Sequence, residues 1–392
     1  MDISIIYVLR FMKLFKNLLI APATLGLLAP MSATANEVTI SDFTPAEQLA
    51  ITNSRVDGLE ARLNNFEAGG FSETTTASFG ANFYAGFEND DDTGNDLDDN
   101  LTTGYDFGIK LTTSFTGEDK LETKFDTGNS DAPGIGEFGG DTQATEALRL
   151  DEISYKFPLG DNITVMVGDD IGASKMFTNA CVYGTPSDTL DECGTNNAFV
   201  NNDSAMIGAE YDFGNGLTAA IGYAGNPDDI ANEEGVDAYG FNFAYTADSY
   251  GVSFTYGALE DGVDSTDGNH NFGTDYAYGL NAYYIPDNEG LPSISVGYEY
   301  GEDDSEAAAS DEYTNVFVGL QWSEFGPGTL GLGMGTRVNT VEDTDAQYMY
   351  EAYYDYPIND GMTITPLIYV KDVSTANTDD TTGVMVKTSF SF

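Results

Sequence analysis

The chain has 392 residues, with 14 Lys and Arg against 65 Asp and Glu and a formal net charge of -51, which argues against a surface for nucleic-acid backbones or anionic lipid headgroups. Aromatic residues make up 12% of the chain and charged residues only 20%, so this is not an acidic disordered protein. Two Cys and one His exclude zinc clusters, iron–sulfur ligation and mechanisms that need two histidines, and we predict no metal, no cofactor and no enzymatic activity.

The first 35 residues have the pattern of a signal peptide. Lys13 and Lys16 precede an apolar stretch that ends in Ala33-Thr34-Ala35, a small-x-small cleavage pattern. Met12 begins a complete signal of its own and is an alternative start of translation. A transmembrane anchor is the other interpretation, but charges and prolines interrupt the apolar run.

Residues 36–72 are predicted to form a periplasmic linker with one short coiled-coil helix. Leu49, Val56 and Leu63 are spaced as in a heptad repeat, and Gly69-Gly70 stops the helical pattern. The helix is either an oligomerisation stalk or one amphipathic helix that lies on the following domain.

From Thr74 to the end of the chain, the hydrophobic period changes to 2, the period of β-strands. About sixteen strands are predicted, at 74–88, 101–116, 119–128, 148–159, 162–170, 204–213, 216–225, 236–247, 250–261, 274–286, 292–302, 311–324, 329–340, 347–358, 361–372 and 381–392. The segment 73–392 is therefore predicted to be all-β.

The connections distinguish a membrane barrel from a soluble sandwich. Tight turns such as Gly160-Asp161 and Gly214-Asn215 alternate with long acidic loops, at 89–100, 129–147, 171–203, 226–235, 262–273, 303–310, 341–346 and 373–380. Short turns at one end and long loops at the other are typical of a transmembrane antiparallel β-barrel in the outer membrane. A soluble exported β-sandwich hydrolase is the alternative, and it would need Greek-key crossovers.

Several motifs resemble those of the carbohydrate-selective (OprB-like) porin family, in particular the major outer-membrane porins of cyanobacteria. They are the heptad Val56-Asp57-Gly58-Leu59-Glu60, the run Phe71 to Thr76, the run Leu150 to Asp161, and a last strand that ends in Phe392. The resemblance implies a homotrimeric outer-membrane channel in contact with lipid and lipopolysaccharide. Family members usually carry an S-layer-homology domain before the coiled coil, whereas here only residues 36–45 occupy that place, so peptidoglycan contact is not expected.

The few basic residues of the predicted barrel fall mostly on its polar face, on strands that closure brings together. The longest loop, 171–203, corresponds to the loop that narrows the pore in porins. We predict a constriction with a basic wall of Lys110, Lys124, Arg149, Lys156, Lys371 and Lys387 and an acidic side of Asp169, Asp170, Asp188, Asp191 and Glu192. Such a transverse field favours polar solutes. The alternative is that each lysine is merely paired with a carboxylate of the lumen.

Two further features concern the loop and the last strand. Cys181 and Cys193 lie in the loop 171–203, and in an exported chain they are predicted to form a disulfide. Phe390 and Phe392 end the last strand and are predicted to be the signal that the barrel-assembly machinery reads. Deletion of Phe392 should reduce membrane assembly, and a normal trimer yield on heat-modifiable gels would contradict this.

Other candidate chemistry is weak. The acidic run from Glu88 to Asn100 does not have the calcium-loop pattern. Tyr283, Tyr353 and Tyr369 are assigned to the membrane-interface girdle rather than to a sugar-binding track. The predicted function is passive diffusion of small hydrophilic solutes and inorganic ions. A carbohydrate-selective porin and a structural or adhesive outer-membrane barrel are the alternatives.

Overall fold

The computed structural model describes residues 74–392, with gaps at 90–99, 131, 133, 141–146, 201–203, 229, 231–236, 260–273, 289, 304–311, 342–343 and 373–379. The predicted signal peptide, linker and coiled-coil helix lie outside the described residues. In the described part of the chain, no helix is long and apolar enough to cross a membrane.

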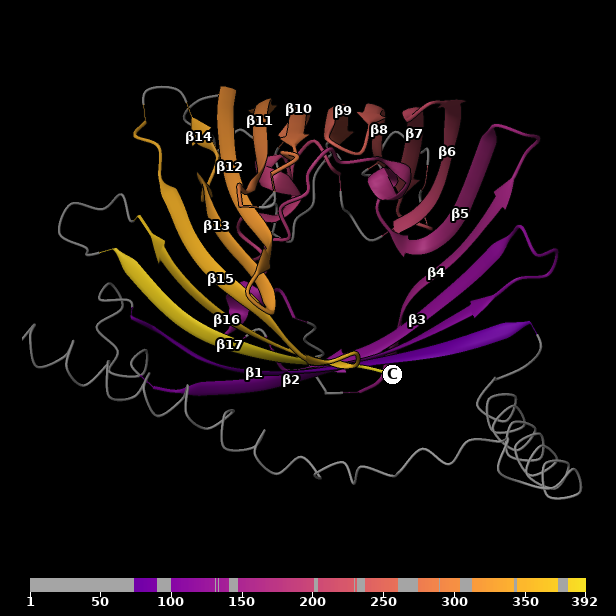
Figure 1. Ribbon diagram of the computed structural model, residues 1–392. Helices are drawn as coiled ribbons and strands as arrows, with labels where there is room; N and C mark the ends of the chain where they lie inside the picture. The colour runs from indigo at the N-terminus through magenta and orange to yellow at the C-terminus, as the bar shows by residue number, and fades with distance from the viewer. Residues whose placement is uncertain are drawn as a thin grey trace, which may run out of the picture. The chain divides into compact units, whose positions relative to one another are not determined.

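The described residues form strands almost from end to end (Figure 1). The strands are β1 (Thr75–Asn89), β2 (Thr102–Thr113), β3 (Lys120–Gly128), β4 (Arg149–Pro158), β5 (Ile163–Ile171), β6 (Ser204–Gly214), β7 (Leu217–Gly225), β8 (Asp237–Thr246), β9 (Tyr250–Leu259), β10 (Thr274–Tyr284), β11 (Ser293–Asp303), β12 (Glu312–Phe325), β13 (Gly328–Thr336), β14 (Thr340–Val341), β15 (Tyr348–Asn359), β16 (Met362–Lys371) and β17 (Thr381–Ser391). Three short 3₁₀ helices accompany them, η3 (Gly136–Phe138), η4 (Ala173–Met176) and η5 (Asp191–Gly194).

The strands close into a single antiparallel barrel. Each wall strand pairs with its neighbours in the chain, and β1 also pairs with β17, with Gly80 opposite Ser391. Two hydrogen bonds between Phe79 and Phe392 complete this seam, at 2.8 and 3.1 Å. The wall has 16 strands, because the two-residue β14 pairs only with β12 while β13 pairs with β15. The predicted fold is confirmed, and the run predicted as one strand at 329–340 is divided into β13 and β14.

The two faces of the wall differ as the alternation predicts. On β8, Tyr239 and Phe243 are 46% and 51% exposed on the outer face, whereas Asn242 between them is buried on the inner face. β11 repeats this arrangement, with exposed Val296 and Tyr298 on either side of the small residue Gly297. A continuous apolar outer surface of this kind is typical of barrels that lie in lipid.

The short turns gather at one end of the barrel and the long connections at the other. Gly160 and Gly214 adopt φ values of 77° and 80°, which residues with a Cβ rarely adopt. This explains why glycine occupies these turns. The last strand ends at the short-turn end, where Gly361 O accepts a hydrogen bond from Ser391 N at 3.0 Å.

The interior is not uniformly polar, because two clusters of buried apolar side chains lie against the inner wall. One joins β1, β12 and β15–β17 to residues from the long connections, namely Tyr84, Ile135, Phe138, Tyr183, Leu190, Cys193, Phe317, Met349, Tyr353, Leu367, Tyr369 and Met385. The other lies at β5–β8, with Met166, Ile171, Ala173, Met176, Met206, Ala220, Ala224 and Ala238.

The assignment of the three tyrosines to the membrane girdle is wrong. Tyr353 and Tyr369 are 2% and 1% exposed and belong to the first interior cluster, where they pack against segments that enter the barrel. Tyr283 lies in β10 two residues from the inner residue Asn281, and its hydroxyl donates to Ala247 O at 2.7 Å. Each tyrosine occupies the same alternate positions in its strand as the residues of the inner face. The abundance of tyrosine in the sequence obscured this pattern.

Candidate pore constriction

Residues 172–200, the long infolded segment, leave β5 and run along the inside of the wall before the chain enters β6 (magenta in Figure 1). The first part of the segment crosses the wall strands from β8 to β11, and three of these strands supply an inner-face acceptor. Thr178 N donates to Asn242 Oδ1 of β8 at 3.0 Å, Ala180 N donates to Ser253 Oγ of β9 at 2.9 Å, and Val182 N donates to Ser295 Oγ of β11 at 3.0 Å. This outbound leg (172–187) is therefore held to the wall strand by strand.

The tip of the outbound leg ends on Glu351 of β15. Its carboxylate accepts hydrogen bonds from Tyr183 OH at 2.7 Å and from Thr185 Oγ1 at 2.9 Å. Gly184 N donates to Gln321 Oε1 of β12 at 2.8 Å. Burial raises the pKa of the Tyr183 hydroxyl, and the nearby Glu351 carboxylate raises it further, so this hydroxyl stays a donor.

The chain then turns back, and the return leg (189–200) has its own anchors. Thr195 Oγ1 donates to Asn281 Oδ1 of β10 at 3.0 Å. Glu299 of β11, with 0% exposure, accepts from Ala198 N at 2.8 Å and from Asn197 Nδ2 at 2.6 Å. A buried carboxylate with this many donors is satisfied without a base.

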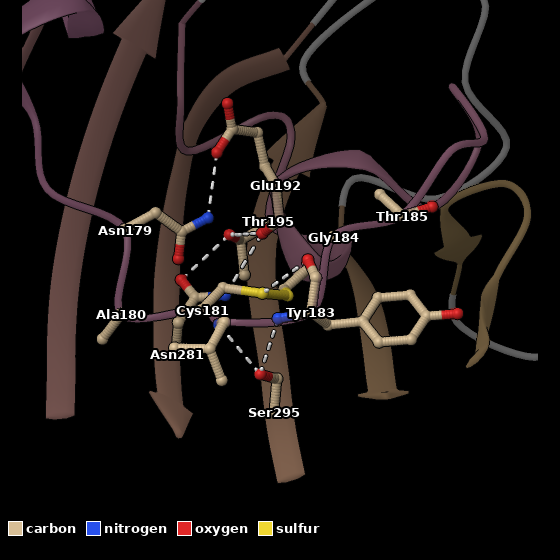
Figure 2. Close-up of a disulfide and its surroundings, with 12 residues drawn as sticks. Asn179, Ala180, Cys181, Tyr183, Gly184, Thr185, Glu192, Thr195, Asn281 and Ser295 are labelled. Carbon is tan, nitrogen blue, oxygen red and sulfur yellow. Dashed lines mark hydrogen bonds between the residues drawn. A yellow bond between two sulfur atoms is a disulfide. The ribbon is translucent and has the colours of Figure 1, made fainter. Parts of the chain in front are cut away.

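The predicted disulfide between Cys181 and Cys193 is confirmed. It joins the outbound leg to the return leg, with Cα atoms 6.4 Å apart (Figure 2). A second link between the legs is the hydrogen bond from Asn179 Nδ2 to Glu192 Oε2, at 2.9 Å. Burial and the neighbouring Asp191 carboxylate raise the pKa of Glu192.

Glycines of the inner wall allow the segment to lie close against the strands. A Cβ built on Gly222 of β7 would lie 1.7 Å from Ala173 O, and one on Gly297 of β11 would lie 1.9 Å from Cys193 O. Only residues without a Cβ permit this approach of backbone to backbone. The small inner-face residues of these strands therefore form the seat of the long infolded segment.

A second segment also enters the barrel, which the sequence pattern did not predict. The connection 129–147 was assigned to the outward loops, but its residues 134–140, the short infolded segment, carry Ile135 and Phe138 into the first interior cluster with 0% and 6% exposure. Burial of these two apolar side chains is the physical reason. Their presence in an otherwise small and acidic loop was the available signal.

The short infolded segment contacts the turn of the long one. Asp188 N donates to Glu137 O at 2.9 Å, and Thr189 Oγ1 donates to Glu137 Oε1 at 3.0 Å. The Glu137 carboxylate also forms an ion pair with Lys371 of β16. Contacts therefore run from the turn of the long infolded segment through Glu137 to β16.

Four lysines lie together on the inner face of β2–β4, and we name Lys110, Lys120, Lys124 and Lys156 the lysine arc. The register places Lys110 opposite Lys124 and Lys120 opposite Lys156. Two carboxylates lie among them. Glu122 pairs with Lys120 and lies 4.0 Å from Lys110, while Glu152 pairs with Lys124 and also with Lys175 of η4, at 2.9 Å.

The lysine arc retains an excess of positive charge that faces water. Each of the two ion-paired carboxylates is shared by two lysines, and within the described residues Lys156 has no ion pair. The side chains of Lys110 and Lys120 are 45% and 48% exposed. Lys175 of the long infolded segment reaches the lysine arc through Glu152, but the hydrogen bonds described above tie the rest of the segment to β8–β12 and β15, away from these strands.

The other predicted basic residues do not join this arc. Arg149 lies opposite Asp126 at the long-loop end of β4. Lys371 is only 14% exposed and is held by Glu137 and by Glu88, at 3.6 Å. Lys387 of β17 lies over the Phe138 ring, 5.2 Å from its centroid.

The five predicted acidic residues are dispersed. Asp169 is opposite the outer-face residue Ile153 in the register, and Asp170 follows it in a bulge with a φ of 55°. Asp188 lies next to the short infolded segment, and Asp191 accepts a hydrogen bond from the neighbouring Glu192 N at 2.8 Å. Within the described ranges, no three His, Cys, Asp or Glu side chains are grouped to hold a metal ion.

The carboxylates closest to the lysines were not among the predicted site residues. They are Glu88, Glu122, Glu137 and Glu152. Glu122 lies two residues from both Lys120 and Lys124, and Glu152 lies four residues from Lys156. Because alternate residues of a strand lie on the same face, the pattern that identified the lysines as inner-face residues also identifies these acids. For Glu137, which is not in a strand, this signal was lacking.

A closed barrel of 16 antiparallel strands with an infolded segment along its inner wall is the architecture of a bacterial porin. The chain is similar to a mutant of the Rh. blastica porin (TM-score 0.55, 15% identity), covering 81% of this chain and 100% of that one. It is similar to OprB of Pseudomonas putida (TM-score 0.56, 12% identity; 81% and 94% covered) and to the anion-selective porin from Comamonas acidovorans (TM-score 0.57, 14% identity; 81% and 99% covered). Neither a protein-family model nor a curated protein sequence matches the chain. At these identities the comparisons establish the fold.

Proposed function

We propose that this chain is an outer-membrane porin through which small hydrophilic solutes and inorganic ions diffuse passively, without catalysis. The observation that carries the proposal is the combination of an apolar outer face with a water-exposed, charged arc inside a closed barrel. A barrel of this kind is stable in lipid and offers ions a polar path through it.

Solute selection is assigned to the passage between the lysine arc and the long infolded segment. The lysines present exposed ammonium groups, and the segment carries Asp188 and Asp191 on exposed positions. Opposed charges of this kind orient dipolar solutes and favour them over apolar ones. The basic wall of this proposal is thus narrower than the one predicted from sequence, because Lys371 and Lys387 are enclosed by protein.

The proposal extends to the parts of the chain outside the described residues. Residues 1–35 direct export, residues 36–72 connect the barrel to the periplasm, and the barrel assembles as a homotrimer in contact with lipopolysaccharide. The similarity to porins of known structure, among them one described as anion-selective, supports the general class. The finer assignment to the carbohydrate-selective family, in its cyanobacterial form, rests on the sequence motifs.

Planar-bilayer recordings test the function and the lysine arc together. The triple variant Lys110→Gln, Lys124→Gln, Lys156→Gln should shift the reversal potential in a salt gradient toward cations. The matched variant with Arg at the same three positions keeps the charge and should behave as the wild type. If the glutamine variant has an unchanged reversal potential, the lysine arc does not select solutes; a wild type without conductance rejects the porin itself.

Liposome swelling separates the remaining alternatives. Sugars and salts both permeate a general porin, whereas a carbohydrate-selective porin prefers sugars and an adhesive barrel with a blocked interior admits neither. The packing of Tyr353 and Tyr369 in an apolar cluster speaks against a track of exposed aromatic rings for sugars.

A further inference from the structure

Lys371 differs from the lysines of the lysine arc in its surroundings. Its side chain is 14% exposed, against 45% for Lys110. It lies between two carboxylates from different segments, Glu88 of β1 and Glu137 of the short infolded segment. Its Nζ also lies 5.1 Å from the centroid of the Tyr369 ring, on its own strand. A lysine enclosed in this way has little charge to offer a passing solute.

Glu137 connects Lys371 to the long infolded segment. Its side chain accepts from Thr189 Oγ1 at 3.0 Å and its backbone carbonyl accepts from Asp188 N at 2.9 Å. One residue therefore contacts β16 through its carboxylate and the turn of the long infolded segment through both carboxylate and carbonyl. Glu137 is the junction between the two infolded segments and the wall.

Apolar contacts seat the same junction but do not orient it. Phe138 packs against Tyr84 of β1 with ring centroids 5.6 Å apart, and the buried Ile135 lies beside it in the cluster. Apolar packing is non-directional, whereas an ion pair and two hydrogen bonds define which way Glu137 points. Without Lys371, the carboxylates of Glu88 and Glu137 would face each other unneutralised, and like charges at close range repel.

We propose that Lys371 is a positioning residue that holds the short infolded segment against the wall and, through Glu137, holds the turn of the long infolded segment, so that it sets the width of the passage. This inference rests on the proposed porin function. It replaces the predicted role of Lys371 as a charge that solutes meet. Two segments then narrow the passage, and the short infolded segment holds the long one in position.

Single-channel recordings in a salt gradient separate the two roles, because width changes conductance and wall charge changes selectivity. Lys371→Met should raise the conductance about twofold, since the junction opens, and should shift the reversal potential less than Lys110→Met does, since the lysine arc stays. Lys110→Met should do the reverse, shifting the reversal potential toward cations at nearly wild-type conductance. Lys371→Arg keeps the ion pairs and should restore the wild-type conductance.

Glu137→Gln provides an independent test that leaves Lys371 in place with Glu88. It should also raise the conductance, by a smaller factor, because the amide retains one acceptor for Thr189. The proposal is overturned if Lys371→Met and Glu137→Gln both conduct like the wild type, or if Lys371→Met changes selectivity alone. If Lys371→Met does not assemble, Glu137→Gln decides by the same criterion. Absence of conductance in the wild type would instead reject the porin function.

Discussion

The long infolded segment lies so close to Gly297 that a single added methyl group should displace it. Gly297→Ala adds one methyl group on the inner face of β11, where the return leg passes. The new Cβ would lie 1.9 Å from Cys193 O, and real Cβ contacts essentially never fall below 3.0 Å. The strand and the return leg must therefore separate by at least about 1.1 Å.

The direction of this movement follows from the covalent and hydrogen-bonded frame. β11 is paired on both sides, with β10 and β12, so the wall resists displacement more than a loop does. The return leg moves toward the middle of the barrel and carries the disulfide with it. Overpacking of this kind costs about 1–3 kcal/mol, which is comparable to the loss of one or two of the neighbouring hydrogen bonds at Asn281 and Glu299.

The assay is single-channel conductance, which should fall because the passage becomes narrower. Gly108→Ala is the matched control, since it adds the same methyl group to the inner face of β2, where the nearest atom is Phe125 O at 3.8 Å. Gly108→Ala should conduct like the wild type. If Gly297→Ala also does so, the return leg does not lie against β11 in the membrane and the reasoning is refuted.

Three further changes test other parts of the structure. Replacing Cys181 and Cys193 by Ser removes a cross-link over 12 residues and should lower the stability of the loop by about 3 kcal/mol, seen as faster proteolysis, which reduction of the wild type should reproduce. Glu299→Ala leaves Ala198 N without its acceptor and removes one of the two acceptors of Asn197 and of Asn315, which also donate to Asn339 Oδ1. The change should lower the free energy of unfolding in denaturant by about 3 kcal/mol, more than the isosteric Glu299→Gln, whereas equal effects would contradict the hydrogen-bond account. Burial opposes ionisation of Asp119 in the β2–β3 turn, but hydrogen bonds from Thr116, Tyr155 and Ser114 outweigh it and hold its pKa well below the usual range. The stabilisation that the Asp119 carboxylate provides is therefore complete above the ordinary pKa of Asp and is lost as pH falls toward the pKa in the folded protein. Asp119→Asn should abolish this acid dependence in thermal unfolding.

The wall could be predicted from sequence because each strand carries its own signal. In β8 and β11, alternate residues differ enough in size and polarity to reveal both faces, and turn glycines such as Gly160 mark the ends. The division between β13 and β14 was not visible, because the residues after Thr336 continue to read as a strand. β13 ends where its neighbour β12 stops pairing with it and pairs with β14 instead.

The interior was harder to predict, because an inner-face position reads the same whether it lines water or packs against an entering segment. Met385 and Leu367 face the interior cluster, yet apolar neighbours on the outer face, such as Val384 and Ile368, hide them in the sequence. Ser253, Asn281 and Glu299 look like ordinary polar lumen residues. Their role as anchors depends on backbone and side-chain groups of a loop far away in the chain, which no local pattern contains.

The satisfaction of the interior carboxylates explains why a chain with a net charge of -51 keeps free positive charge inside its barrel. Within the described residues Glu299 and Glu351 form no ion pair with a lysine. Instead, amide donors of the long infolded segment reach both carboxylate oxygens of Glu299, and its hydroxyl donors reach Oε1 of Glu351. A loop that supplied fewer donors would need bases at these positions, and the chain has only 14 to distribute. Because the long infolded segment supplies donors to the acids beneath it, Lys110, Lys120 and Lys156 are left to face the open side of the barrel. The position of the long infolded segment and the charge of the channel are therefore coupled. Displacing the segment would expose Glu299 and Glu351 and should make the passage more selective for cations even with every lysine in place.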